Sequence, residues 1–174
     1  MMKKQSVGMQ FLAEDTSGKL VAVLQVRPKW NQEKNTPESY PGACQVTVHG
    51  KLEEGEDFLQ ALLREVGEEL GEEIVPVVKD LRENKKLIEL VNLEDPEKHI
   101  ITYGGIVEKA VLNKSTSREK SREFGGFKLI QQNEIEKIVD VQTFDKNTGV
   151  TDENTIAMFP DEKEAVKIAF EKLV

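Results

Sequence analysis

The chain has 174 residues, of which 38% are hydrophobic and 32% charged, a composition typical of a globular protein that buries a core. Its formal net charge of -8 disfavours a nucleic-acid polymer as partner, because such binding needs a basic face. The single cysteine excludes an internal disulfide, and no apolar run approaches the roughly 20 residues of a membrane span. We therefore expect a cytoplasmic protein, with residues 1–174 forming one domain and no membrane contact.

The N-terminal part of the chain predicts a hairpin, a long loop and a short strand. Residues 6–13 and 20–27 are apolar, partly β-branched runs around a turn-rich segment, which is typical of a β-hairpin. Residues 28–42 are polar and contain three prolines, which predicts a loop. Residues 43–50 then read as a short strand.

A helix is predicted over residues 57–70. Its apolar side chains recur at every fourth position, as on the buried face of a helix. They are Phe58, Leu62, Val66 and Leu70. Gly71 follows and is expected to end the helix.

The remainder of the chain predicts further strands and two helices. Three apolar runs read as strands: residues 73–81, 86–93 and 99–112. Residues 113–123 read as a charged loop, and a short helix is expected to start near Asn133, whose side chain could cap it. The chain closes with an amphipathic helix over residues 160–174. This order predicts an α/β domain with a mixed sheet covered by helices.

Three glutamates in the predicted helix point to a metal site. Glu65, Glu68 and Glu69 are spaced i, i+3 and i+4, so they share one helix face. Oxygen ligands of this kind suit Mg²⁺ or Mn²⁺ better than zinc. The alternative is a solvated acidic face that binds no metal.

Two residues near these glutamates fit a metal site. Arg64 can pair with a carboxylate that precedes the helix, such as Glu56, in a fork-to-carboxylate geometry. Gly50 opens the loop into the helix, and glycine suits a position where the backbone bends or approaches a ligand.

The spacing of these residues resembles the signature of the Nudix hydrolases. From Gly50 there are five residues to Glu56 and seven more to Arg64, followed by Glu65, an apolar residue, any residue, and Glu68 and Glu69. Gly71 also matches, and the departure comes at the last position, where the family has an apolar residue and this chain has Glu72. We expect the departure to tilt the following strand, with Ile74 taking the inward place, and to leave the metal ligands untouched.

The resemblance implies a Nudix-type α/β/α sandwich with a mixed sheet between helices. It also implies hydrolysis of a diphosphate bond in a nucleoside diphosphate linked to another moiety, with Mg²⁺ or Mn²⁺ as cofactor. The implied metal ligands are Glu65, Glu68, Glu69 and the Gly50 carbonyl, and Glu56 and Arg64 would form the supporting ion pair. The general base differs between members of the family, so it stays open.

Many Nudix enzymes add a carboxylate from a loop on the far side of the cleft. Here that loop offers Glu119 and Glu123, and Glu123 is the preferred further metal ligand. The alternative is that both are ordinary solvated charges.

Three residues near the long loop are candidates for binding the substrate. Trp30 and Tyr40 could stack on a base, and core packing is the alternative for each. Arg27 could bind phosphate or be a surface charge at the end of a strand. The expected partner is a small-molecule nucleotide or other diphosphate, and the resemblance admits a homodimer.

Two other functions compete with a hydrolase. One is a non-catalytic Nudix-fold module that binds a nucleotide or regulates a partner, and the other is an unrelated acidic interaction protein. The intact set of Arg64, Glu65, Glu68 and Glu69 favours the enzyme, because degenerate members would be expected to have lost one of these residues.

Overall fold

A computed structural model describes residues 2–31, 34–116 and 126–174, and its centre is a seven-stranded mixed sheet. The strands of this sheet are β1 (Lys4–Glu14), β2 (Leu20–Val26), β5 (Cys44–Gln45), β6 (Val48–Lys51), β7 (Ile88–Glu94), β8 (Lys98–Glu108) and β9 (Phe127–Ile130). Two small ribbons pair β3 (Trp30–Asn31) with β4 (Thr36–Pro37), and β10 (Val139–Asp140) with β11 (Ala157–Met158).

Strand β1 organises the sheet. It runs parallel to β8 along its whole length, and β8 pairs with β7 in the antiparallel sense. On its other edge β1 pairs first with β6 and then with β2, both antiparallel. The β1–β2 pairing, with Leu12 opposite Ala22, confirms the predicted hairpin.

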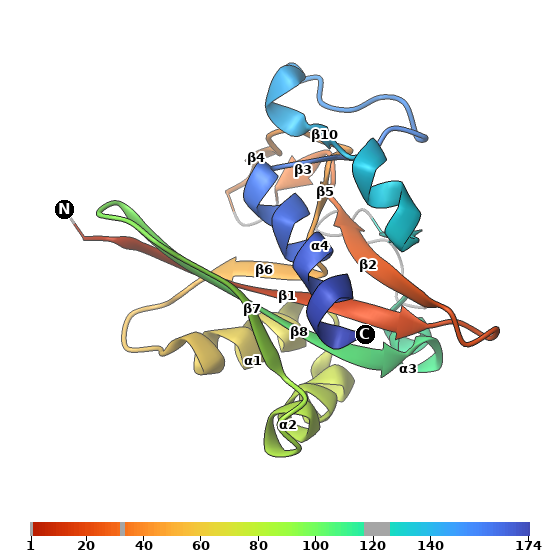
Figure 1. The fold of residues 1–174 in the computed structure, drawn as a ribbon. Helices are drawn as coiled ribbons and strands as arrows, with labels where there is room; N and C mark the ends of the chain where they lie inside the picture. The colour runs from red at the N-terminus through yellow and green to blue at the C-terminus, as the bar shows by residue number, and fades with distance from the viewer. Residues whose placement is uncertain (1, 32–33, 117–125) are drawn as a thin grey trace.

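Helices cover both faces of this sheet (Figure 1). The helices are α1 (Phe58–Glu69), α2 (Val75–Glu83), α3 (Lys109–Thr116) and α4 (Pro160–Leu173), with short 3₁₀ turns η1 (Glu72–Ile74), η2 (Gln132–Lys137) and η3 (Val141–Thr143). Figure 1 shows α1 and α2 on one side and α4 crossing the other. Met9 and Phe11 of β1 pack in the core beneath α1, whereas Leu12 packs beneath α4. The expected mixed sheet between helices is therefore present.

The strand predicted over residues 73–81 is wrong, because this segment forms η1 and α2. Pro76 lies in the first turn of α2, where a proline costs no helix hydrogen bond. Ile74, Val78 and Leu81 are buried at helical spacing. Ile74 thus takes the expected inward place, but from a 3₁₀ turn.

The strand predicted over residues 43–50 is interrupted at Val46 and Thr47, which separate β5 from β6. The Thr47 hydroxyl accepts a hydrogen bond from the Phe11 backbone N–H at 2.9 Å and donates to the Val23 carbonyl. Because β5 pairs with β2 and β6 pairs with β1, this side chain bridges the two ladders where the chain changes partner.

Other predicted boundaries also move. The strand predicted over residues 99–112 ends at Glu108, and α3 follows it directly. The short helix expected near Asn133 is the 3₁₀ turn η2, which Gln131 caps instead. In the described part of the chain, no helix is long and apolar enough to cross a membrane.

Candidate functional site

The orientation of α1 follows from its cap and its buried face. The Asp57 carboxylate accepts a hydrogen bond from the Gln60 backbone N–H at 2.8 Å, and the Gln60 side chain accepts one from the Asp57 N–H at 2.9 Å. Leu62 and Val66 are fully buried against the sheet. The helix stops before Gly71, whose φ of 117° favours glycine. With this face buried, Glu65, Glu68 and Glu69 lie beside the buried residues of α1.

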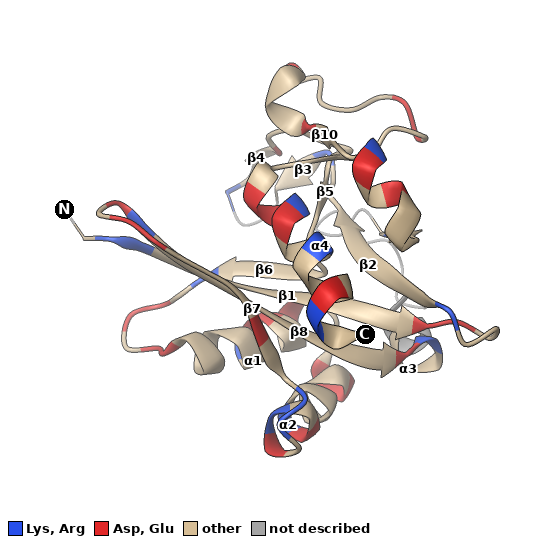
Figure 2. Ribbon diagram, in the orientation of Figure 1, with Lys and Arg blue, Asp and Glu red and all other residues tan. Residues whose placement is uncertain are grey.

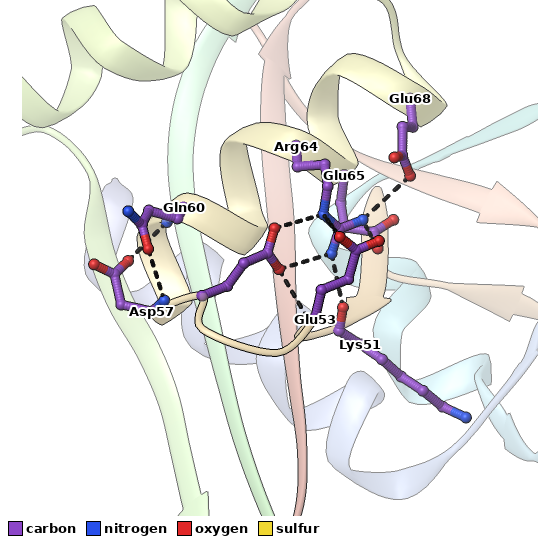
Figure 3. A network of polar contacts seen from close by, with 8 residues as sticks. Lys51, Glu53, Asp57, Gln60, Arg64, Glu65 and Glu68 are labelled. Atoms are coloured by element: carbon purple, nitrogen blue, oxygen red, sulfur yellow. Dashed lines mark hydrogen bonds and ion pairs between the residues drawn. The ribbon is translucent and has the colours of Figure 1, made fainter.

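Arg64 ties the loop that precedes α1 to the helix (Figure 3). Its Nε and Nη2 donate to the two carboxylate oxygens of Glu56 at 2.7 and 3.0 Å, and Nη2 also donates to the Lys51 carbonyl at 2.9 Å. The hydrogen bond from Arg64 holds the pKa of Glu56 below its usual range. The expected Arg64–Glu56 ion pair is therefore present, with fork-to-carboxylate geometry.

The same guanidinium lies against two of the three candidate metal ligands. Arg64 Nη1 donates to Glu65 Oε1 at 2.8 Å and to Glu68 Oε2 at 3.3 Å. The Glu65 side chain is 13% exposed, whereas the Glu68 side chain is 58% exposed. A cationic group thus already bridges these two carboxylates, which is the charge that a metal ion would bring.

Gly50 lies in direct contact with Glu65. A Cβ atom placed on Gly50 would stand only 2.0 Å from the Glu65 carboxyl carbon. Gly50 is not among the glycines with a positive φ, so close approach and not backbone conformation explains the glycine. The backbone of β6 therefore forms a cradle for this carboxylate.

Glu69 turns toward the same strand. Its Oε2 accepts a hydrogen bond from the His49 backbone N–H at 3.2 Å. Burial raises the pKa of Glu69 well above its usual range, and the nearby charges of Glu65 and Glu68 raise it further. A bound cation would relieve this repulsion.

The donor set fits Mg²⁺ or Mn²⁺ by its chemistry, since every candidate ligand is an oxygen. Among the residues that the structure describes, no three His, Cys, Asp or Glu side chains are grouped as a metal site. Glu65 and Glu68 accept hydrogen bonds from Arg64, and Glu69 accepts one from the His49 backbone N–H. To bind a metal, these carboxylates would have to exchange hydrogen bonds to the protein for bonds to the ion. Glu119 and Glu123 lie outside the described residues.

A cavity of about 230 Å³ adjoins β6, where His49 lines it. Its walls include Arg27, Gln45, His49, Phe159, Asp161 and Glu162. They come from the end of β2, from β5 and β6, and from the first turn of α4, which are distant in sequence. Figure 2 shows acidic residues both on the loop before α1 and at this end of α4.

The three candidate substrate residues lie in different surroundings. Arg27 reaches the cavity, with its guanidinium paired to Glu38 at 2.9 Å. Tyr40 packs edge-on against Phe159, with ring centroids 5.7 Å apart, beside the cavity wall. Trp30 is 37% exposed in β3 and is not among the cavity residues.

Five cavity residues went unnoticed in the sequence. They are Gln45, Lys98, Phe159, Asp161 and Glu162. Asp161 and Glu162 look like ordinary acidic residues of a first helical turn, where the helix dipole favours them. No local signal marks them, because the cavity residues Arg27, Gln45 and His49 lie more than 100 positions earlier in the chain.

Glu162 should make folding stability depend on pH. Its Oε1 accepts a hydrogen bond from the Val46 N–H at 3.2 Å, and burial raises its pKa to about 8. The folded state therefore holds the proton more tightly than the unfolded state does. The resulting stabilisation is complete below the ordinary carboxyl range and is lost as pH rises toward about 8, by at most about 1.4 kcal/mol per pH unit.

Denaturant unfolding at several pH values measures this effect. Relative to Glu162→Gln, the parent protein should lose stability between about pH 5 and pH 8. Glu164→Gln, an exposed position on the same helix, is the matched control and should follow the parent. Parallel curves for the parent and Glu162→Gln would contradict the prediction.

Comparison with known proteins agrees with this architecture. Residues 2–154 match the family model of the NUDIX domain. A mutT/nudix family protein from Listeria innocua has a TM-score of 0.58 at 18% identity, covering 98% of this chain and 94% of its own. The NUDIX domain of Shewanella oneidensis NrtR, solved with ADP ribose, has a TM-score of 0.59 at 14% identity, covering 100% and 90%.

A third structure has the same fold. A NUDIX family hydrolase from Clostridium perfringens has a TM-score of 0.50 at 13% identity, and the alignment covers 100% of this chain and 100% of that protein. None of the curated proteins matches this sequence significantly. The structural likenesses show the fold, and the family model spans most of the sequence. The chain therefore belongs to the NUDIX domain family.

Proposed function

We propose that this protein hydrolyses a diphosphate bond in a nucleoside diphosphate linked to another moiety, with Mg²⁺ or Mn²⁺ as cofactor. The observation that carries the proposal is the complete carboxylate helix of a NUDIX domain, held against β6 by Gly50 and His49. The family match supports a hydrolase, and the preserved glutamates support catalysis over binding alone.

Glu65, Glu68, Glu69 and the Gly50 carbonyl would hold the metal. When bound, a divalent cation would offset the diphosphate charge, polarise the phosphorus and lower the pKa of a coordinated water. Arg64 and Glu56 hold the loop against the helix, so the Gly50 carbonyl and the glutamates keep one relative placement. Glu69 is partly buried, and the His49 N–H donates to one of its oxygens and so fixes the position of that oxygen.

Metal binding should be measurable without a substrate. Because a ligand that binds only the folded state stabilises it, Mg²⁺ or Mn²⁺ at about 100 times its Kd should add about 2.7 kcal/mol. Thermal unfolding with increasing metal, reversed by a chelator, measures the effect. Glu68→Gln should weaken it, and a parent protein indifferent to both metals would oppose the proposal.

Turnover is tested with a panel of diphosphate compounds. Nucleoside triphosphates, nucleotide sugars, ADP-ribose and dinucleoside polyphosphates would be incubated with Mg²⁺ or Mn²⁺, and released phosphate or nucleotide measured. Turnover of one class by the parent protein, lost in Glu68→Gln, would support the hydrolase and name its substrate class.

The second candidate function is a non-catalytic module that binds a nucleotide. The ion pairs of Arg64 with Glu65 and Glu68 favour it, because they occupy two carboxylates that catalysis needs for metal. Binding of a nucleotide without turnover of any compound in the panel would favour this alternative.

A further inference from the structure

The cavity beside β6 has the size for one moiety of a substrate. At about 230 Å³ it is smaller than the roughly 300–1,000 Å³ of pockets that enclose whole drug-sized ligands. Its walls combine the aromatic ring of Phe159 with polar side chains, and Tyr40, which does not line the cavity, packs edge-on against that ring. Phe159 is the one apolar side chain among the seven described residues that line the cavity, so a flat heterocycle would find one ring to stack on and several polar groups at its edge.

Strand β6 connects this cavity to the carboxylate helix. His49 lines the cavity, and its backbone N–H donates to Glu69 at 3.2 Å. The next residue, Gly50, touches Glu65. In the described part of the sheet β6 pairs only with β1, so no strand covers its other edge. A substrate with one moiety in the cavity can therefore pass this edge and present its next group to the carboxylates.

Arg27 is held in place by neighbouring residues and is poorly suited to bind a phosphate group. Its guanidinium donates to Glu38 at 2.9 Å, to the Ser39 carbonyl at 2.9 Å and to Gln45 at 3.2 Å. The negative charge of Glu38 offsets its positive charge, and the two other charged lining residues, Lys98 and Asp161, carry opposite signs. The described lining of the cavity therefore has no surplus of positive charge for the diphosphate itself and suits a neutral polar group.

Glu162 is the cavity residue best placed to form a hydrogen bond with a neutral polar group of a ligand. Its Oε1 accepts from the Val46 N–H, and no second hydrogen bond is formed among the described residues. Burial raises its pKa to about 8, so near pH 7 the carboxyl is mostly neutral and can both donate and accept. The charged or titratable groups that face it are Asp161 on its own helix, the cavity residues Arg27, His49 and Lys98, and the buried thiol of Cys44 in β5.

We propose that this cavity binds the nucleobase of the substrate and that Glu162 is the specificity-determining residue that hydrogen-bonds its edge; the inference rests on the proposed function. A neutral carboxyl pairs with any base edge that sets an acceptor beside a donor, such as N1 and the amino group of adenine. An ionised carboxylate only accepts, so it repels adenine N1 and still pairs with the two adjacent donors of guanine. Ionisation of Glu162 should thus shift the preference from adenine toward guanine.

Binding of AMP and GMP tests the inference without any metal or turnover. Calorimetric titration of the full chain should show that Glu162→Ala weakens AMP binding about tenfold, the net effect of losing the hydrogen bonds to N1 and the amino group. From about pH 6.5 to about pH 8.5 the AMP-to-GMP affinity ratio should fall several-fold in the parent protein. It should stay constant in Glu162→Gln, which keeps a donor, an acceptor and the contact with Val46. Glu164→Gln should behave as the parent.

The results separate this inference from the hydrolase proposal. Absence of binding of both nucleotides, unchanged AMP affinity in Glu162→Ala, or an AMP-to-GMP ratio that ignores pH in the parent would each overturn it. Turnover of the diphosphate panel without nucleotide binding would leave the hydrolase and remove the cavity as a base site. Nucleotide binding with the expected pH shift but without turnover would support the cavity and remove the hydrolase.

Discussion

Replacement of Glu69 by glutamine should lower metal-dependent turnover by about 10²–10³-fold while leaving the metal-free protein at least as stable as the parent. Glutamine keeps the shape of the side chain and an oxygen that can accept from the His49 N–H. It removes a buried charge that Glu65 and Glu68 repel. The substitution therefore removes the carboxylate that would hold a metal. It also removes the electrostatic repulsion that destabilises the metal-free folded state.

Steady-state kinetics and thermal unfolding with and without Mg²⁺ measure the two halves of this prediction. Glu54→Gln is the matched control, because Glu54 lies in the same acidic segment with an exposed side chain. It should change neither turnover nor the stabilisation by metal. A Glu69→Gln protein that turns over substrate normally would remove Glu69 from the metal site, and one that unfolds would show a structural role instead.

Gly50→Ala should cost about 10²-fold in turnover with little loss of folding stability. The added Cβ would stand 2.0 Å from the Glu65 carboxyl carbon, so one of the two must move. The atoms it meets belong to the end of a flexible side chain, which can turn away at small cost to folding. A displacement of about 1 Å in a catalytic group is enough for a rate loss of this size.

The comparison is Gly55→Asn in the same loop. A Cβ at Gly55 meets nothing within 4 Å, and asparagine tolerates the positive φ of 84° at this position. Turnover and metal-induced stabilisation should be lost together in Gly50→Ala and kept in Gly55→Asn. Equal activity of Gly50→Ala and the parent would show that the contact with Glu65 has no part in the reaction.

The carboxylate helix could be predicted from the sequence because its determinants are local. The four-residue period of Phe58, Leu62, Val66 and Leu70 sets both the existence of α1 and the face that it buries. The Arg64–Glu56 pair spans only eight positions, so its partner could be named from spacing. The roles of Glu65, Glu68 and Glu69 as metal ligands stay predictions.

Secondary structure that depends on contacts between distant segments could not be predicted from the sequence in the same way. The segment of residues 73–81 is rich in β-branched side chains, which favour strands, yet its apolar spacing and Pro76 also suit a helix. Burial of Val78 and Leu81 in the core with α1 decides for the helix. The break between β5 and β6 likewise depends on Thr47 finding partners on β1 and β2.

The sequence by itself determined the family signature, the helix that carries it and the pairing of Arg64 with Glu56, because each depends on residues within about two dozen positions. Only the tertiary structure decided that Glu162 reaches Val46, 116 positions earlier, and that α4 and β6 enclose one cavity. Burial in this cavity, and not residue type, raises the Glu162 pKa. An acidic residue in a first helical turn acquires that property only when a distant segment of the chain packs against it and reduces its contact with water.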